Sequence, residues 1–143
     1  LVCGGEYVEY HGRHYDFGRL MVRPAPTEPV PIYVGGLSPA GLRRAARLGD
    51  GWISVVNSTE ELASVIPQLH DLRREAGRDD RPFEIKAICS DVFEEQGFRR
   101  LHELGVTDAM VCPWYFYPGD PHDLDHQRSS LERFAAEVMS AFE

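Results

Sequence analysis

Short apolar segments alternate with amphipathic segments from residue 31 to the end of the chain. The short apolar runs are typical of buried strands, whereas the amphipathic segments repeat apolar residues at helical spacing. We expect strands over 32–34, 52–56, 83–89 and 109–112, and helices over about 39–48, 58–77, 92–104 and 130–142. Trp52, at the start of the second strand, is expected to be a core residue. This order predicts an α/β fold of four consecutive parallel βα units. A complete (β/α)8 barrel needs eight units and roughly 250 residues, so the pattern corresponds to half of a TIM barrel.

The first 30 residues do not follow this alternation. The segment 7–17 favours a short hairpin around His11 and Gly12. The segment 23–31 contains four prolines and is expected to be an extended linker, because proline fixes φ and removes a hydrogen-bond donor. We therefore divide the chain into an irregular N-terminal segment with a Pro-rich linker, 1–30, and a half-barrel, 31–143.

Capping residues predict where the helices begin. Ser38 and Ser58 are expected N-caps of the first two helices, and Glu61 would complete a capping box with Ser58. Asp91 is the expected cap of the third helix, and Ser129 that of the last helix. Pro67 should kink the second helix, because it removes a hydrogen-bond donor inside it.

The stretch PIYVGGLSPAG, 31–41, predicts an anion-binding turn. Gly35 and Gly36 end a strand, and they permit unusual φ values and a close approach of a ligand to the backbone. Ser38 then opens a helix whose free N–H groups and positive dipole end attract phosphate. The glycine spacing matches neither the Rossmann fingerprint nor an ATPase P-loop. The alternative is that the two glycines only make a tight turn.

Three segments carry a family resemblance: GRHYDF (12–17), RPAPTEPVPIYVGGLSPAGLRRAARLGDGWI (23–53) and LRREAGRD (72–79). Together they resemble the luciferase-like monooxygenase family, in particular its branch that uses the deazaflavin coenzyme F-420. The resemblance implies a (β/α)8 barrel that binds FMN or coenzyme F-420, of which this chain is similar to the C-terminal half. It also implies that the turn Gly35, Gly36, Leu37 and Ser38 holds the cofactor phosphate. Gly41 falls where related enzymes can place a hydroxyl residue, so that contact would be missing here.

The same resemblance sets the expected function. The chain would be the C-terminal part of a flavin- or F-420-dependent oxidoreductase or monooxygenase acting on a small-molecule substrate, and it would supply the cofactor phosphate site. The family's catalytic polar residues belong to the other half, so we expect no catalytic residue here. The alternative is a truncated half-barrel that acts as a non-catalytic binding or interaction module. In either case the open sheet should be covered, by a second copy or by the missing N-terminal half.

Charge and cysteine content indicate which partners and which cellular compartment to expect. The formal charge is −8, from 23 acidic residues against 15 Lys and Arg, which disfavours nucleic acid and anionic membranes as partners. No apolar run is long enough for a membrane helix and no signal peptide is visible, so we expect a cytoplasmic protein. The three cysteines, Cys3, Cys89 and Cys112, show no paired spacing and indicate a reducing compartment, with Cys89 and Cys112 buried.

Three other groups of residues have alternative interpretations. Asn57, Ser58 and Thr59 follow the second strand and would contact a polar cofactor tail or merely cap a helix. The aromatic residues 114–117 would line a flat ligand, cover the core or form a subunit contact. The histidines near residues 11–14 and 122–126 lack zinc-type spacing, so we expect no metal.

Overall fold

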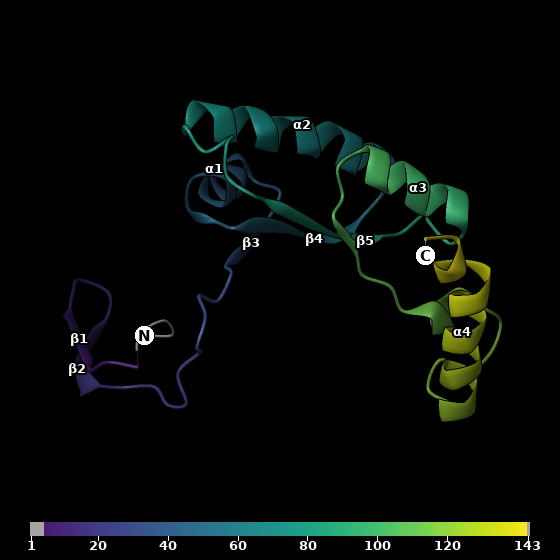
Figure 1. The fold of residues 1–143 in the computed structure, drawn as a ribbon, viewed down its shortest axis with the longest axis horizontal. Coiled ribbons are helices and arrows are strands. Elements are labelled where there is room, and N and C mark those ends of the chain that lie inside the picture. Colours follow the sequence, from purple (N-terminus) through teal and green to yellow (C-terminus); the bar gives the residue numbers. More distant parts are fainter. Residues whose placement is uncertain (1–4, 143) are drawn as a thin grey trace. The chain divides into compact units, whose positions relative to one another are not determined.

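The computed structural model describes residues 5–142, and the chain divides into two units, Leu1–Ile32 and Tyr33–Glu143. In the first unit, β1 (Val8–His11) and β2 (Asp16–Leu20) pair antiparallel, so the predicted hairpin is confirmed (Figure 1). The Tyr10 and Phe17 rings lie 6.0 Å apart across the two strands. Such a cross-strand aromatic pair stabilises a two-stranded ribbon.

The second unit is built on one parallel sheet. Its strands are β3 (Tyr33–Gly35), β4 (Gly51–Asn57), β5 (Glu84–Cys89) and β6 (Asp108–Ala109), in the order β3-β4-β5-β6. Every neighbouring pair is parallel, which confirms the predicted sheet. The last strand is shorter than the predicted 109–112. After Met110 donates to the Ala87 carbonyl, the chain turns into a short 3-10 helix, Pro113–Tyr115.

Four α-helices belong to this unit: α1 (Pro39–Leu48), α2 (Thr59–Glu75), α3 (Glu95–Glu103) and α4 (Leu124–Glu137). Figure 1 shows α1, α2 and α3 on one side of the sheet. The core lies between them and the sheet; its buried members are Leu42, Ala45, Trp52, Leu62, Ile66, Leu69, Ile85, Ala87, Val92, Leu101 and Val106. The α2 helix continues through Pro67 as a single element.

The helix caps agree with the sequence at α1 and α2 but not at α3 and α4. Ser38 and Ser58 accept N–H groups of their helices as predicted, and the capping box of Ser58 is complete. The prediction that Asp91 caps α3 is wrong. Its carboxylate instead accepts the backbone N–H and the hydroxyl of Thr59, each at 3.0 Å, and so holds the start of α2.

The last two helices begin at other residues than those predicted. The α3 helix starts after Glu94, whose side chain makes no capping bond. The α4 helix starts after Asp123, whose carboxylate accepts the His126 N–H, rather than after Ser129. Ser129 lies inside α4 and donates to the His126 carbonyl. Asp123, six residues before Ser129, bonds an orphan N–H, so the helix begins earlier than predicted.

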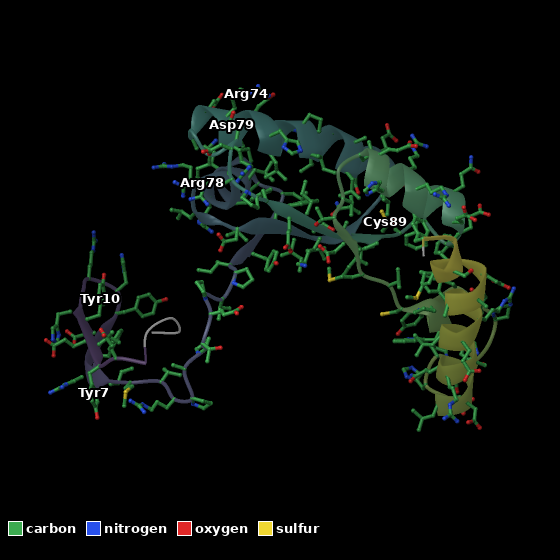
Figure 2. The ribbon with its side chains drawn as sticks, in the orientation of Figure 1. Tyr7, Tyr10, Arg74, Arg78, Asp79 and Cys89 are labelled. Carbon is green, nitrogen blue, oxygen red and sulfur yellow. The ribbon has the colours of Figure 1, made fainter. Side chains whose placement is uncertain are left out.

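A buried arginine organises the loop between α2 and β5. The Arg73 guanidinium donates to the carbonyls of Arg78 and Arg81 and lies 4.2 Å from the centre of the Phe83 ring. Arg78 in turn donates to the Gly49 carbonyl at 3.0 Å. Figure 2 shows Arg78 and Asp79 at the end of the sheet opposite to Cys89. These contacts fix the amino-terminal end of the sheet.

The sheet face opposite the helices is open and partly charged. Tyr33 on β3 donates its hydroxyl proton to Glu84 on β5, and its ring crosses over Gly51 of the strand between them. Lys86 binds Glu84 at 3.0 Å and Asp108 on β6 at 3.2 Å. The hydrogen bond from the Tyr33 hydroxyl is the main cause that lowers the pKa of Glu84. The pKa of Asp108 is also lowered, chiefly by a hydrogen bond from the Thr107 hydroxyl and then by Lys86.

Two valines extend the open face toward the carboxyl end of β4. Val55 and Val56 are 69% and 59% exposed, and the β4–β5 register shifts between Ile53 and Val56. The Ser54 hydroxyl accepts the Ile88 N–H at this irregularity. A bulge lets consecutive side chains leave the regular alternation of a strand, which accounts for two adjacent exposed valines in a central strand.

We predict that Gly51→Ala destabilises the protein by about 1–3 kcal/mol. A Cβ at residue 51 would lie 2.6 Å from both the Glu84 carbonyl and the Tyr33 ring, so the backbone or the ring must shift. Urea unfolding followed by circular dichroism measures the change. Gly18→Ala is the control, since a Cβ there meets nothing within 4 Å. Equal midpoints for the two variants would contradict the tight crossing of Tyr33 over β4.

We also predict that Asp91→Ala lowers the free energy of unfolding by about 1–2 kcal/mol, because it leaves the N–H of buried Thr59 without its acceptor. Glu94→Ala should change it by less than about 0.5 kcal/mol, because Glu94 makes no side-chain capping bond. Thermal unfolding of both variants tests the assignment. An unchanged free energy of unfolding for Asp91→Ala would contradict the contact between Asp91 and Thr59.

Candidate functional site

The turn between β3 and α1 carries the four residues predicted to hold a phosphate. Gly36 has φ +107, a conformation that favours glycine, whereas Gly35 belongs to β3 and is not among the residues with positive φ. A Cβ at Gly36 would meet nothing within 4 Å. Residues 35–40 are all exposed to solvent. The turn therefore requires glycine at residue 36 for its backbone conformation, and the space in front of it is open.

Ser38 and Gly41 hold the turn close to the helix. The Ser38 hydroxyl accepts the Gly41 N–H at 3.1 Å, and the Ser38 carbonyl accepts the Leu42 N–H at 2.9 Å. A Cβ at Gly41 would lie 3.3 Å from both the Gly36 carbonyl oxygen and the Ser38 hydroxyl. Gly41 thus allows the strand end and the first helical turn to approach closely.

The Gly36 carbonyl is held from the opposite side by Trp52. The indole N–H of this fully buried residue on β4 donates to it at 3.1 Å. The sequence places Trp52 in the core, and this prediction is confirmed. The hydrogen bond was not predicted, because the sequence does not reveal that a side chain on one strand reaches the turn after its neighbour.

The start of α1 is electropositive and has no acidic residue. Pro39 occupies the first helical position, and the N–H of Ala40 lies in the first turn, where an α-helix offers no internal acceptor. The helix also carries Arg43, Arg44 and Arg47 and no carboxylate. Its dipole and its charge both favour an anion at the β3–α1 turn.

The start of α2, at the same edge of the sheet, is already occupied by carboxylates of the chain. Glu61 accepts the Ser58 N–H at 2.8 Å and the Asn57 amide at 3.2 Å, and these bonds lower the pKa of Glu61. Asp91 accepts the Thr59 N–H and hydroxyl. Asn57, Ser58 and Thr59 therefore serve as helix-capping residues, as in the second of the two sequence interpretations. The two helix starts differ: α2 is neutralised internally and α1 is not.

Cys89 lies at the end of β5 beside this second helix start (Figure 2). Burial raises the pKa of its thiol, and the Asp91 carboxylate adds to the effect. A thiol with a raised pKa is a poor nucleophile. Cys112 is exposed, so its predicted burial is wrong, because the chain has already left the sheet at that residue. Cys3 lies outside the described residues.

The aromatic segment 114–117 covers the core in part. The Phe116 ring packs edge-on against Phe93 and Phe134, with centroids 5.0 and 5.8 Å apart. The Tyr117 hydroxyl donates to Glu137 on α4 at 3.1 Å, while Tyr115 is exposed. Phe116 and Tyr117 thus join α4 to the rest of the second unit.

Two negative observations hold for the described part of the chain, residues 5–142. We find no group of three or more His, Cys, Asp or Glu side chains placed to hold a metal ion. Within those residues, no helix combines the length and the apolar character needed to cross a membrane.

Comparison with known proteins identifies the family of the chain. The family model described as luciferase-like monooxygenase matches residues 2–90. An uncharacterized protein of Mycobacterium tuberculosis is 42% identical over 139 residues, which are 95% of this chain and 47% of that protein. The F-420-dependent glucose-6-phosphate dehydrogenase of Nakamurella multipartita is 36% identical over 76 residues, which are 52% of this chain and 22% of that enzyme.

Solved structures show the same fold at low identity. The coenzyme F-420-dependent tetrahydromethanopterin reductase of Methanopyrus kandleri matches with a TM-score of 0.68 and 16% identity, over 97% of this chain and 59% of that one. An F-420-dependent secondary alcohol dehydrogenase, solved with an F-420-acetone adduct, matches with a TM-score of 0.51 and 17% identity, over 94% of this chain and 49% of that one. The chain spans about half the length of the mycobacterial protein. Because the family model matches more than half of its residues, the chain belongs to the luciferase-like monooxygenase family.

Proposed function

We propose that this chain is the C-terminal half-barrel of a luciferase-like oxidoreductase and that it holds the phosphate of coenzyme F-420 or FMN at the β3–α1 turn. The observation that carries the proposal is the start of α1, whose first turn presents the Ala40 N–H, contains no acidic residue and follows a glycine with positive φ. Several relatives and matching structures are F-420-dependent enzymes, which supports this cofactor class.

The residues of the turn would bind and orient the phosphate. The Ala40 N–H and the Ser38 hydroxyl lie at the positive end of α1, where a phosphate gains from both hydrogen bonds and the helix dipole. The Gly36 backbone leaves open space for its approach. A bound deazaflavin or flavin would supply the hydride or electron chemistry, and the protein would supply its position and electrostatic surroundings. We assign no catalytic acid or base to this chain.

The open face of the sheet is the second part of the proposal. The exposed Val55 and Val56 and the Tyr33–Glu84–Lys86–Asp108 network would face the interior of a barrel, and four more βα units would cover them. Exposed apolar residues on a central strand favour such a partner. The complementary half, or a second copy of this chain that takes its place, would close the barrel at the edges of β3 and β6.

We predict that Gly36→Val abolishes FMN and coenzyme F-420 binding. A β-branched residue cannot adopt φ +107 without strain, and its side chain would fill the open approach to the turn. Fluorescence titration of this chain is expected to give weak affinity for the unmodified protein, because half of the pocket wall is absent. Ser38→Ala should weaken binding by about fivefold, or about 1 kcal/mol.

Gly77→Val is the matched control for backbone strain. Gly77 also has positive φ and open space around a Cβ, but it follows α2 at the other end of the sheet. It should retain the affinity of the unmodified chain. Equal affinities for Gly36→Val and the unmodified chain would place the cofactor elsewhere and reduce the two glycines to a tight turn.

We predict that the chain associates through its open face and that Val56→Asp weakens this association. A carboxylate on the exposed apolar strand would have to be desolvated at the interface. Sedimentation velocity over a concentration series measures the self-association of both proteins. Leu48→Asp, at the exposed end of α1, is the control. A monomer at high micromolar concentration would contradict self-association. Association without any FMN or F-420 binding would instead support the binding-module alternative.

A further inference from the structure

The hydrogen bond from Trp52 to Gly36 joins the core to the β3–α1 turn. Trp52 lies on β4, paired in register with Val34 on β3, and its ring is fully buried under the helices. Its N–H reaches past the end of β3 to the carbonyl of Gly36 at 3.1 Å. A buried indole N–H needs an acceptor, and here the acceptor is a backbone group of an exposed turn.

The direction of this carbonyl decides what the turn offers to a ligand. The peptide bond after Gly36 is trans, so its C=O and the N–H of Leu37 point in opposite directions. With the oxygen turned inward to Trp52, the Leu37 N–H is directed away from the core. Were the peptide reversed, the carbonyl dipole would present its negative end to an incoming anion. Glycine at residue 36 makes both orientations sterically accessible, so its conformation alone does not fix the direction.

We propose that Trp52 is the positioning residue of the phosphate site: its indole N–H locks the Gly36–Leu37 peptide so that the Leu37 N–H joins the Ala40 N–H in binding the anion. This inference rests on the proposed function of the turn. Gly41 lies close to the same carbonyl on the helix side, since a Cβ there would lie 3.3 Å from the oxygen. The carbonyl therefore lies between α1 and Trp52, and Trp52 supplies a directional hydrogen bond to it.

The experiment compares Trp52→Phe with Ile66→Val in the full chain by ¹⁵N NMR. Phenylalanine keeps an aromatic ring in the core but removes the donor. Ile66 is buried in the same core, on α2, and serves as the control for a loss of packing that leaves the turn intact. Two readouts are recorded: the amide resonance of Leu37 without ligand, and its shift on titration with inorganic phosphate and with FMN.

In the unmodified chain, phosphate and FMN are expected to shift the amide resonances of Leu37 and Ala40. Trp52→Phe should move the ligand-free Leu37 resonance and raise the phosphate concentration for half-saturation by about five- to tenfold, the usual effect of one lost hydrogen bond. Ile66→Val should match the unmodified chain in both readouts.

The outcomes separate this inference from the proposed function. If Trp52→Phe binds phosphate like the unmodified chain and leaves the Leu37 resonance in place, the positioning role is wrong while the phosphate site stands. If Ile66→Val weakens binding as much as Trp52→Phe, the effect is general core packing and the positioning role is again wrong. If neither phosphate nor FMN shifts any resonance of the turn in the unmodified chain, the phosphate site itself fails, and the role of Trp52 with it.

Discussion

Parallel pairing of β3, β4 and β5 is the constraint on which the rest of the second unit depends. Parallel neighbours must be joined by crossovers, here the helices α1 and α2, which return the chain to the opposite end of the sheet. The carboxyl ends of the strands and the amino ends of the following helices therefore meet at one edge. The parallel topology therefore places the electropositive starts of α1 and α2 at this edge, whatever their side chains are. This edge holds both the β3–α1 turn and the β4–α2 turn.

The two turns at this edge differ in where the chain places its carboxylates. Glu61 and Asp91 occupy the start of α2 with charged hydrogen bonds, whereas the first turn of α1 contains no acid and begins with proline. A helix start that is neutralised by carboxylates of the chain stabilises the fold, whereas one without a carboxylate keeps the positive end of its dipole available to an anion. The same secondary structure thus serves stability at one strand end and the proposed binding at the next.

The chain spans about half of the mycobacterial relative and still forms a well-defined sheet, because contacts on both faces of the sheet stabilise it. One layer of helices buries the apolar side chains of Trp52, Ile85 and Ala87. On the other face, Lys86 joins two carboxylates and Tyr33 crosses β4, so the polar groups of that face bind one another. Only Val55 and Val56 remain as exposed apolar groups in the middle strand, and they indicate where further chain would pack.

The sequence by itself determined the order of the elements, the parallel sheet, the caps at Ser38 and Ser58, the burial of Trp52 and the family. The elements, the sheet and the caps follow from local signals, namely apolar periodicity and capping side chains, whereas the family follows from the resemblance of the segments 12–17, 23–53 and 72–79. Only the tertiary structure decided contacts between residues far apart in the chain. Asp91 binds Thr59, 32 residues away, instead of its own helix, and Trp52 binds Gly36 across two strands. A short polar side chain or an indole N–H bonds whichever polar group the fold brings within about 3 Å, and no local pattern in the sequence shows which group that is.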